Sequence, residues 1–352
     1  DVTTSTRPEP GALMAAEIAE QPAVFERVLR DGLADAAEVG RVLRERAPRF
    51  VMFAGRGTSD HAALYAKYLV EVRLGLPAGL ASPSTLTAYG SRPDLRDVLL
   101  VAVSQSGGSP DLVETVSVAR ACGAHTLAVT NAPESDLARA AELHLDVRAG
   151  AESAVAATKS YTAELLTLWL AVQAVLGEDP SVADAVPAAA AALVERGDEV
   201  AALAARYRFT DRIVLTGRGY SFPTVLEGAL KLMETSYVAA HAFSGADLLH
   251  GPLAMIDSDH PVLAVVPPGV GEIAMRPVLE RLRERGADVT VLGGPASLEL
   301  ATVGMDLGHT LREDLAPLVD VIPLQQLALR SAVARGFDPD RPRGLSKITE
   351  TW

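Results

Sequence analysis

Cysteine is nearly absent from this chain, because its 352 residues include only one, Cys122. A single thiol excludes an internal disulfide and any metal site built from several cysteines, and it fits a reducing compartment. The seven histidines show no metal-ligand spacing, and the HExxH pattern of zinc proteases does not occur. We therefore expect no metal and no other cofactor, and we expect Cys122 to pack at the end of a helix.

Positive charge is also scarce, with 32 Lys and Arg against 45 Asp and Glu and a formal net charge of −13. Nucleic acids and anionic membrane surfaces bind basic patches, and the sequence contains none. The first ten residues lack the basic and apolar regions of a signal peptide. The longest apolar stretch, residues 154–176, carries Lys159, Glu164 and Gln173, so it predicts a buried helix rather than a membrane span. We expect a cytoplasmic protein that binds neither nucleic acid nor membrane.

A loop rich in hydroxyls and glycine, Ser104–Ser109 (SQSGGS), follows the apolar run Val98–Val103 and precedes Pro110. Such a run is typical of a buried parallel strand, and open α/β sheets bind ligands at the carboxyl ends of their strands. Glycine lets the backbone approach an anion, while serine hydroxyls and helix-start amides donate to phosphate oxygens. An ordinary capped turn also uses serine, but three Ser, one Gln and two Gly in six residues exceed what a cap needs. The loop therefore predicts a phosphate-group site.

A second pattern occurs twice, which indicates an internal repeat. Gly55–Ser59 (GRGTS) and Gly217–Ser221 (GRGYS) each follow an apolar run, and they begin 162 residues apart, nearly half the chain. This period predicts two copies of one α/β unit rather than a solenoid, whose repeats are far shorter. The second copy has Pro267–Gly271 where the first has the Ser104–Ser109 loop, and it has lost every hydroxyl. Only the first unit is therefore expected to bind phosphate.

Alternating apolar runs and helical patterns predict the fold class, which is α/β with two tandem doubly wound parallel sheets. The expected division is an N-terminal helical arm (1–35), a first domain (36–182), a second domain (183–337) and a C-terminal tail that closes the active site (338–352). In the first unit the pattern predicts strands at 49–54, 97–103, 125–130 and 143–147, and helices at 59–73, 110–121 and 134–141. A helical pair at 154–176 and 183–206 leads to the second unit, with strands at 212–216, 261–266, 288–292 and 318–323 and helices at 222–236 and 272–285.

The predicted helix after the second GRGxS turn carries charge within an otherwise apolar sequence. Its residues Glu227, Lys231 and Glu234 lie at i, i+4 and i+7 and so share one helix face. An exposed, salt-bridged stripe would have the same spacing, but the preceding turn puts the helix start at the ligand-binding edge of the sheet, which favours a functional carboxylate. His250, before a Gly-Pro turn, and Lys347, in the tail, are more typical of structural and solvated residues when taken alone.

Six motifs in order resemble the sugar isomerase domain family over nearly the whole chain, from about Ala15 to Thr351. In particular, the sequence is similar to the tandem isomerase half of glutamine–fructose-6-phosphate aminotransferases and to stand-alone glucosamine-6-phosphate deaminases. The resemblance implies two flavodoxin-like domains, a hexosamine 6-phosphate as small-molecule partner, and a homodimer with shared active sites. The motifs are GRGTS (55–59), SQSGGSPD (104–111), AVAATKSYT (154–162), LEGALKLMETSY (226–237), ADLLHGPLAMID (246–257) and RPRGLSKITET (341–351).

The resemblance also implies a role for each matching residue. Glu234 would move a proton between C1 and C2 of the sugar, His250 would assist ring opening from the neighbouring subunit, and Lys347 would form a Schiff base with a ketose phosphate. Lys231 would lie near the reacting carbons, and Glu227 completes the implied catalytic set. The 6-phosphate is expected on Ser59, Ser104, Gln105, Ser106 and Ser109, and the rest of the sugar against Gly57, Thr58, Ala157, Thr158 and Ser346.

Three departures from the aminotransferase pattern bear on the reaction. The sequence has no N-terminal cysteine nucleophile, so we do not expect it to release ammonia from glutamine. The phosphate loop continues as Ser109-Pro110-Asp111, a form more similar to that of the deaminases. Met233 and Leu249 stand where the family commonly has a basic residue.

These features lead to one leading hypothesis and three competing ones. The leading hypothesis is a glucosamine-6-phosphate deaminase of the isomerizing type, which releases fructose 6-phosphate and ammonia. A lyase or dehydratase that acts on N-acetylhexosamine 6-phosphates by elimination would suit the loss of two basic residues. The third hypothesis is the isomerase subunit of an aminotransferase that uses external ammonia, and the fourth is a sugar-phosphate sensor without catalysis.

Overall fold

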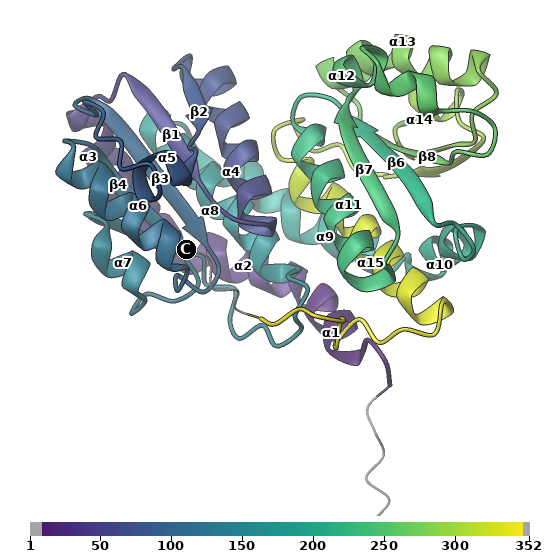
Figure 1. Cartoon of the computed structure of the whole chain (residues 1–352), viewed down its shortest axis with the longest axis horizontal. Helices are drawn as coiled ribbons and strands as arrows, with labels where there is room; N and C mark the ends of the chain where they lie inside the picture. Colours follow the sequence, from purple (N-terminus) through teal and green to yellow (C-terminus); the bar gives the residue numbers. More distant parts are fainter. Residues whose placement is uncertain (1–8, 348–352) are drawn as a thin grey trace, which may run out of the picture.

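The computed structural model describes residues 9–347 and shows two α/β domains lying side by side (Figure 1). The first sheet contains β1 (Phe50–Ala54), β2 (Ala78–Leu80), β3 (Val98–Ser104), β4 (His125–Thr130) and β5 (Leu143–Asp146). The second contains β6 (Arg212–Gly217), β7 (Ala239–Ser244), β8 (Val262–Val266), β9 (Val289–Gly293) and β10 (Val303–Asp306). All neighbouring strands are parallel, in the orders β2-β1-β3-β4-β5 and β10-β9-β8-β6-β7, which are one arrangement repeated. The predicted tandem α/β fold is confirmed.

Helices cover both faces of the first sheet, as the alternation along β3 shows. Leu99, Val101 and Val103 pack in one apolar cluster, while Leu100 and Ala102 pack in another on the opposite face. Because both faces are buried, the whole strand is apolar, which explains why its sequence reveals it so clearly. The covering helices are α3 (Leu33–Arg46), α4 (Thr58–Leu69) and α8 (Lys159–Leu176) on one face and α6 (Pro110–Ala121) and α7 (Asp136–Ala140) on the other.

The two domains share one continuous hydrophobic core. Buried residues of α4 and α8 lie in the same cluster as those of α11 (Ser221–Ser236) and α15 (Pro317–Ala334) from the second domain. Helices α4 and α11 are in contact where the two domains meet (Figure 1). The charged stripe of α11 is thereby brought against the first domain.

Residues 318–323, predicted as a strand, form the first turns of helix α15 instead. The segment is buried on every side, and a short apolar run bounded by no clear signal cannot distinguish a strand from a buried helix. Its length decides the matter, since the helix continues to Ala334 and packs against α11 and α10 (Gly197–Arg206).

The other differences from prediction concern short or interrupted elements. The strands β2 and β10 have three and four residues, and β7 is a partly exposed edge strand, so none shows a recognisable period. The predicted helix 183–206 is divided into a 3-10 turn (Pro180–Ala185), α9 (Val186–Val194) and α10. The predicted helix 154–176 begins only at Lys159, which leaves residues 149–158 as a loop.

The N-terminal arm and the C-terminal tail lie against each other. The arm forms α1 (Ala12–Ala19) and α2 (Gln21–Asp31), and the tail runs from the end of α15 back towards the first domain (Figure 1). The Asp340 carboxylate accepts the N–H groups of Leu13 and Met14, each at 2.9 Å, which satisfies two donors at the start of α1. Residues 1–8 of the predicted arm and 348–352 of the predicted tail lie outside the described part.

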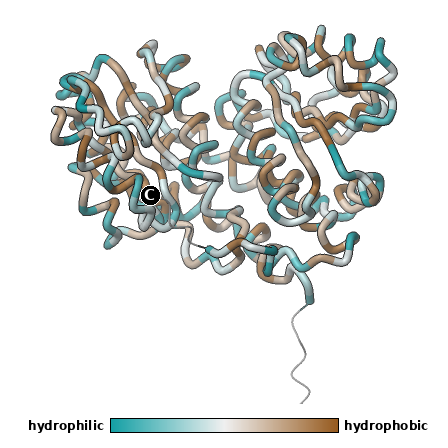
Figure 2. Tube along the Cα trace, in the orientation of Figure 1, coloured by the Kyte–Doolittle hydropathy of each residue, from teal (hydrophilic) through white to brown (hydrophobic). Residues whose placement is uncertain are grey.

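The hydrophobic residues follow this architecture. Figure 2 shows them concentrated along the strands and the inward sides of the helices, while the outer turns are largely hydrophilic. The helix α8 is buried from Lys159 to Gln173, as the sequence predicted. Within residues 9–347, no helix combines the length and apolarity needed to cross a membrane.

Candidate active site

A polar cavity of about 320 Å³ opens at the carboxyl edge of the first sheet. A second cavity, of about 500 Å³, lies between the same sheet and the helices α3, α4 and α8. Its walls are mostly apolar and bring no cluster of polar groups together. We therefore place the site in the polar cavity, where groups from both domains and the tail converge. Its lining residues are Arg56, Gly57, Thr58, Ser59, Val103, Ser104, Gln105, Ser106, Ser109, Leu112, Val155, Ala157, Ser160, Glu164, Glu234, Leu345, Ser346 and Lys347.

The loop after β3 is shaped by its own serines. Ser104 Oγ accepts the N–H of Gly107 at 3.1 Å, and Ser106 Oγ accepts that of Gly108 at 3.3 Å. Gly107 has φ +62°, and a Cβ there would lie 2.1 Å from the Ser135 hydroxyl, so no other residue fits. The loop thus curls around the cavity before α6 begins at Pro110, the arrangement that holds an anion at a helix start.

A chain of polar contacts links the two domains beside this cavity. The Lys231 Nζ atom lies 2.7 Å from Glu234 Oε2 and 3.3 Å from Glu227 Oε1. The same Nζ donates to Thr58 Oγ1 at 3.1 Å, and Thr58 Oγ1 donates to Glu227 Oε1 at 3.0 Å. His61 Nδ1 lies 2.7 Å from the other oxygen of Glu227. Of the three charged residues on α11, Glu234 is the one that lines the cavity, and 22% of its side chain is exposed.

The charge of Lys231 is fixed by its surroundings. Burial alone would lower the pKa of this fully buried ammonium, but the Glu227 and Glu234 carboxylates outweigh burial and raise the pKa above its ordinary value. Lys231 is therefore a permanent cation that neutralises two carboxylates. It orients Glu234 rather than accepting protons itself.

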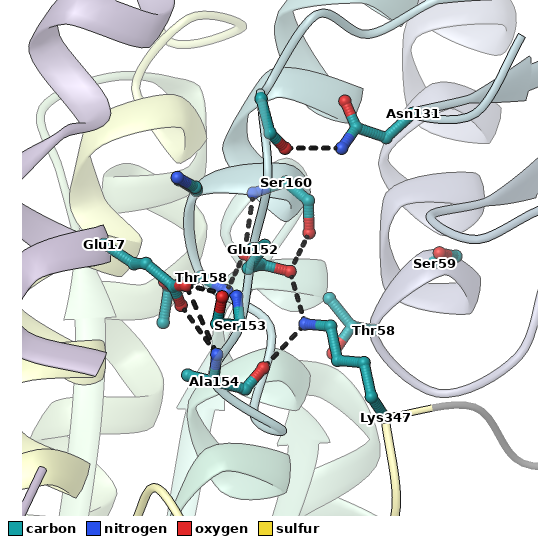
Figure 3. Close-up of polar contacts among 12 residues, drawn as sticks. Glu17, Thr58, Ser59, Asn131, Glu152, Ser153, Ala154, Thr158, Ser160 and Lys347 are labelled. Atoms are coloured by element: carbon teal, nitrogen blue, oxygen red, sulfur yellow. Dashed lines mark hydrogen bonds and ion pairs between the residues drawn. The ribbon is translucent and has the colours of Figure 1, made fainter. Parts of the chain in front are cut away.

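Lys347 reaches the cavity from the tail and is held by the loop before α8 (Figure 3). Its Nζ donates to Glu152 Oε2 at 2.8 Å and to the Ala154 carbonyl oxygen at 2.7 Å. Glu152 also accepts the N–H groups of Thr158 and Ser160, at 2.9 and 3.1 Å, and the Ser160 hydroxyl at 2.7 Å. Burial opposes ionisation of Glu152, but Lys347 and these donors outweigh it and hold the pKa of Glu152 below its ordinary value. One ionised carboxylate therefore ties the tail to the start of α8.

The same loop is fixed from its other side by the arm. The Glu17 carboxylate, on α1, accepts the N–H groups of Ser153 and Ala154 (Figure 3). Since Asp340 of the tail holds the start of α1, the arm, the loop and the tail form a closed set of contacts. This set determines where Lys347 enters the cavity.

A further carboxyl group in the cavity wall has a different environment. Glu164, on α8, is 1% exposed, and its Oε1 atom lies 2.9 Å from Ser59 Oγ. Among the residues that the structure describes, nothing donates a hydrogen bond to its Oε2 atom. Burial, aided by the nearby Glu152 and Glu227 carboxylates, raises the pKa of Glu164 well above its ordinary value despite the bond from Ser59.

The structure brings most of the predicted site residues to one cavity. Lys231, Glu227 and Thr158 are buried beside its lining rather than in it, and His250 is exposed on the second domain away from the cavity of its own chain. In residues 9–347, no group of three or more His, Cys, Asp or Glu side chains could hold a metal ion. The predicted residues in the lining are Gly57, Thr58, Ser59, Ser104, Gln105, Ser106, Ser109, Ala157, Glu234, Ser346 and Lys347.

Five polar residues at the site were missed by sequence reasoning, namely Arg56, His61, Glu152, Ser160 and Glu164. Glu152 precedes an apolar helix and Glu164 lies within it. An acidic residue in such an apolar setting is a signal of a buried role. His61 follows the first GRGxS motif by two residues, and nothing in the sequence indicated its contact with Glu227.

Comparison with known proteins finds the same repeat. The model of the SIS domain matches the chain twice, at residues 46–174 and 207–335, which span the two sheets. A glutamine–fructose-6-phosphate aminotransferase (isomerizing) of Methanothermobacter thermautotrophicus is 36% identical over 343 residues, covering 95% of this chain and 56% of that protein. The corresponding protein of Pyrococcus horikoshii is 33% identical over 342 residues, covering 95% and 57%. The chain thus spans little more than half the length of these relatives.

Solved structures have the same architecture. The C-terminal domain of the glucosamine–fructose-6-phosphate aminotransferase of Francisella tularensis matches with a TM-score of 0.79 and 26% identity, covering 93% of this chain and 97% of that one. The glucosamine-6-phosphate deaminase of Thermotoga maritima matches with a TM-score of 0.72, covering 97% and 100%. At 23% sequence identity, this match shows a similar fold and nothing further.

Proposed function

This chain belongs to the SIS domain family, and from that premise we propose that it interconverts a hexosamine 6-phosphate with a ketohexose 6-phosphate and ammonia. The direction we propose is the deamination of glucosamine 6-phosphate to fructose 6-phosphate. The observation that carries this proposal is a single cavity lined by the 104–109 loop of one domain, by Glu234 of the other and by Lys347 of the tail.

One side of the cavity suits the phosphate. The serines and glycines of the 104–109 loop lie with Ser59 at the starts of α6 and α4, where backbone N–H groups favour anions. Arg56 adds a guanidinium at the rim, already paired with Asp111 at 2.6 Å. Binding the phosphate away from the reacting carbons supplies energy to orient the sugar.

The other side suits proton transfer. In the open-chain amino sugar, Glu234 takes the proton from C2 and returns it to C1, while one proton of the C2 ammonium passes to O1. The aldehyde and ammonium thus become an alcohol and a C2 iminium. Water adds to this iminium and releases ammonium, leaving the ketose. Lys231 holds Glu234 in place throughout by a 2.7 Å ion pair. The predicted ring-opening role of His250 requires a neighbouring copy of the chain, because His250 lies away from this cavity.

A second candidate is the same chemistry run backwards, as in an aminotransferase half supplied with ammonia from elsewhere. It is favoured by the 36% identity to an aminotransferase over 95% of this chain. Both candidates need the same phosphate site, formed by Ser59 and the 104–109 loop, and the same proton transfer.

An assay of hexosamine phosphates tests the proposal. We expect ammonia and fructose 6-phosphate to form from glucosamine 6-phosphate, and glucosamine 6-phosphate to form from fructose 6-phosphate with an ammonium salt. The ratio of the two rates at matched concentrations separates the two candidates. An unsaturated product from N-acetylglucosamine 6-phosphate would replace the proposal with an elimination reaction, and tight binding without any product would replace it with a sensor.

Lys347 should be labelled when a ketose phosphate is trapped on it. Sodium borohydride added with fructose 6-phosphate would reduce a Schiff base to a stable secondary amine, detected by mass spectrometry of the tail peptide. For this reaction Lys347 must leave Glu152, which it contacts at 2.8 Å. The variant Lys347→Arg should lose the label, whereas Lys159→Arg, which changes a buried lysine paired with Glu20, should keep it. Equal labelling of both variants would exclude the role.

A further inference from the structure

We propose that Glu164 acts in ligand binding as a neutral carboxylic acid that donates a hydrogen bond to Ser59, so that Ser59 can donate its own proton to the phosphate of the bound sugar. This inference rests on the proposed function and extends it to a residue that the motifs do not include. Glu164 would be a positioning residue, since it acts through Ser59. The geometry behind it is a 2.9 Å contact between Glu164 Oε1 and Ser59 Oγ in the wall of the cavity.

A serine hydroxyl has one proton to donate and two lone pairs that accept. If Glu164 is ionised, its carboxylate takes the only proton of Ser59, and Ser59 presents lone pairs to the phosphate oxygens. Those oxygens also carry lone pairs, so the contact is repulsive. If Glu164 is neutral, its O–H donates to Ser59 Oγ, and the Ser59 proton is released for the phosphate.

The surroundings of Glu164 favour the neutral acid. The side chain is 1% exposed, and its Oε2 atom lacks a hydrogen-bond partner among the described residues, which would be very costly for a carboxylate. The titratable groups that face it are Glu152 from the preceding loop, Glu227 from α11 and Tyr161 from α8 itself. None of them is a cation.

The cations around the cavity are already paired with other carboxylates. Arg56 pairs with Asp111 at 2.6 Å, Lys347 with Glu152 at 2.8 Å, and Lys231 with Glu234 at 2.7 Å. Within the part of the chain that the structure describes, Glu164 forms no ion pair with any of them. A negative charge at Glu164 would also be separated from the bound phosphate only by the Ser59 side chain. Ionisation would therefore weaken binding in two ways, by taking the Ser59 proton and by repelling the phosphate charge.

The sign of the resulting pH dependence follows directly. Burial raises the pKa of Glu164, so the binding form is present below that pKa and is lost as the pH rises through it. Affinity for a phosphate ester should then fall by up to about tenfold per pH unit, the limit for one linked proton. Glu164→Gln is a matched variant, because its amide can donate to Ser59 at every pH.

The test uses sorbitol 6-phosphate, which has neither an amine nor a carbonyl group, and starts at about pH 7.5, where its phosphate is a dianion. Infrared difference spectra should show a protonated carboxyl band in the wild type that is absent from Glu164→Gln. The band should shift on adding sorbitol 6-phosphate, and the shift should disappear in Ser59→Ala. Titration calorimetry at rising pH should give wild-type affinity that falls below that of Glu164→Gln at the pH where the band is lost.

Several results would overturn this inference. They are the absence of the carboxyl band, an equal ligand-induced shift in Ser59→Ala, and loss of the band at high pH while the wild-type affinity still follows the Glu164→Gln curve. If the band persists at the highest pH, the affinities of the wild type and of Glu164→Gln should change with pH in parallel. The inference is then tested only by the ligand-induced shift of the band and its loss in Ser59→Ala. If the wild type binds neither sorbitol 6-phosphate nor inorganic phosphate at any pH, the phosphate site of the proposed function is what fails.

Discussion

Replacing Glu234 with glutamine should nearly abolish turnover of glucosamine 6-phosphate while leaving its binding close to that of the wild type. Glutamine has the same shape and remains within reach of Lys231, but it cannot carry a proton from C2 to C1. Loss of a positioned acid–base group lowers kcat by roughly 10²–10⁴-fold. The affinity should change little, because the phosphate is held on the opposite wall by Ser59 and the 104–109 loop.

Steady-state kinetics and isotope exchange check this expectation together. In deuterated water the wild type should exchange hydrogen at C1 of fructose 6-phosphate, and Glu234→Gln should not. The matched control is Glu280→Gln, which removes a carboxylate from an exposed i,i+4 pair with Arg276 at 3.3 Å in the same domain. The control should behave as the wild type. Retained exchange in Glu234→Gln would remove Glu234 from the mechanism and leave its position in the cavity unexplained.

The fold was predictable where burial is two-sided and the chain is regular. The helix 110–121 and the strand 125–130 occupy the predicted residues, because an apolar run bounded by glycine and proline has few other ways to fold. The internal repeat was visible for a related reason. Each GRGxS turn follows an interior strand, β1 or β6, and the glycine at its centre, Gly57 or Gly219, has positive φ in both domains.

The hydrophobic period did not predict the right element where a segment is buried on all sides. Residues 318–323 lie in a helix that packs against α10 and α11, so no polar face marks a period of 3.6, and the segment was predicted as a strand. The edge strand β2 is too short to show alternation. Both elements are determined by long-range packing, which local patterns do not contain.

The candidate site was predictable in its parts but not in its connections. The 104–109 loop and the stripe of α11 both stand out in the sequence, but the contact that joins the domains, between Thr58 and Glu227, spans 169 residues. The contact between Lys347 and Glu152 spans 195 residues. A sequence shows which residues can carry charge, whereas the pairing of those charges depends on the folded arrangement of α4, α11 and the tail.

Replacing Lys231 with methionine should destabilise the protein by about 3–5 kcal/mol, the range found when one partner of a buried ion pair is removed. The ammonium is fully buried and lies 2.7 Å from Glu234 and 3.3 Å from Glu227. Methionine keeps most of the volume but leaves Glu227, also fully buried, without its cation. The midpoint of urea unfolding should therefore fall sharply, with an unchanged slope if the unfolded states are alike.

The matched control is Lys67→Met, which removes the same side chain from an i,i+4 pair on a helix. Lys67 lies 2.7 Å from Glu71, but the two side chains are 26% and 36% exposed, so water replaces much of the interaction. That variant should lose less than about 1 kcal/mol. The double variant Lys231→Met with Glu227→Gln should recover stability, because it removes the stranded charge, and it provides the measurement if Lys231→Met alone does not fold. Equal losses for the two lysines would show that burial does not set the strength of the pair.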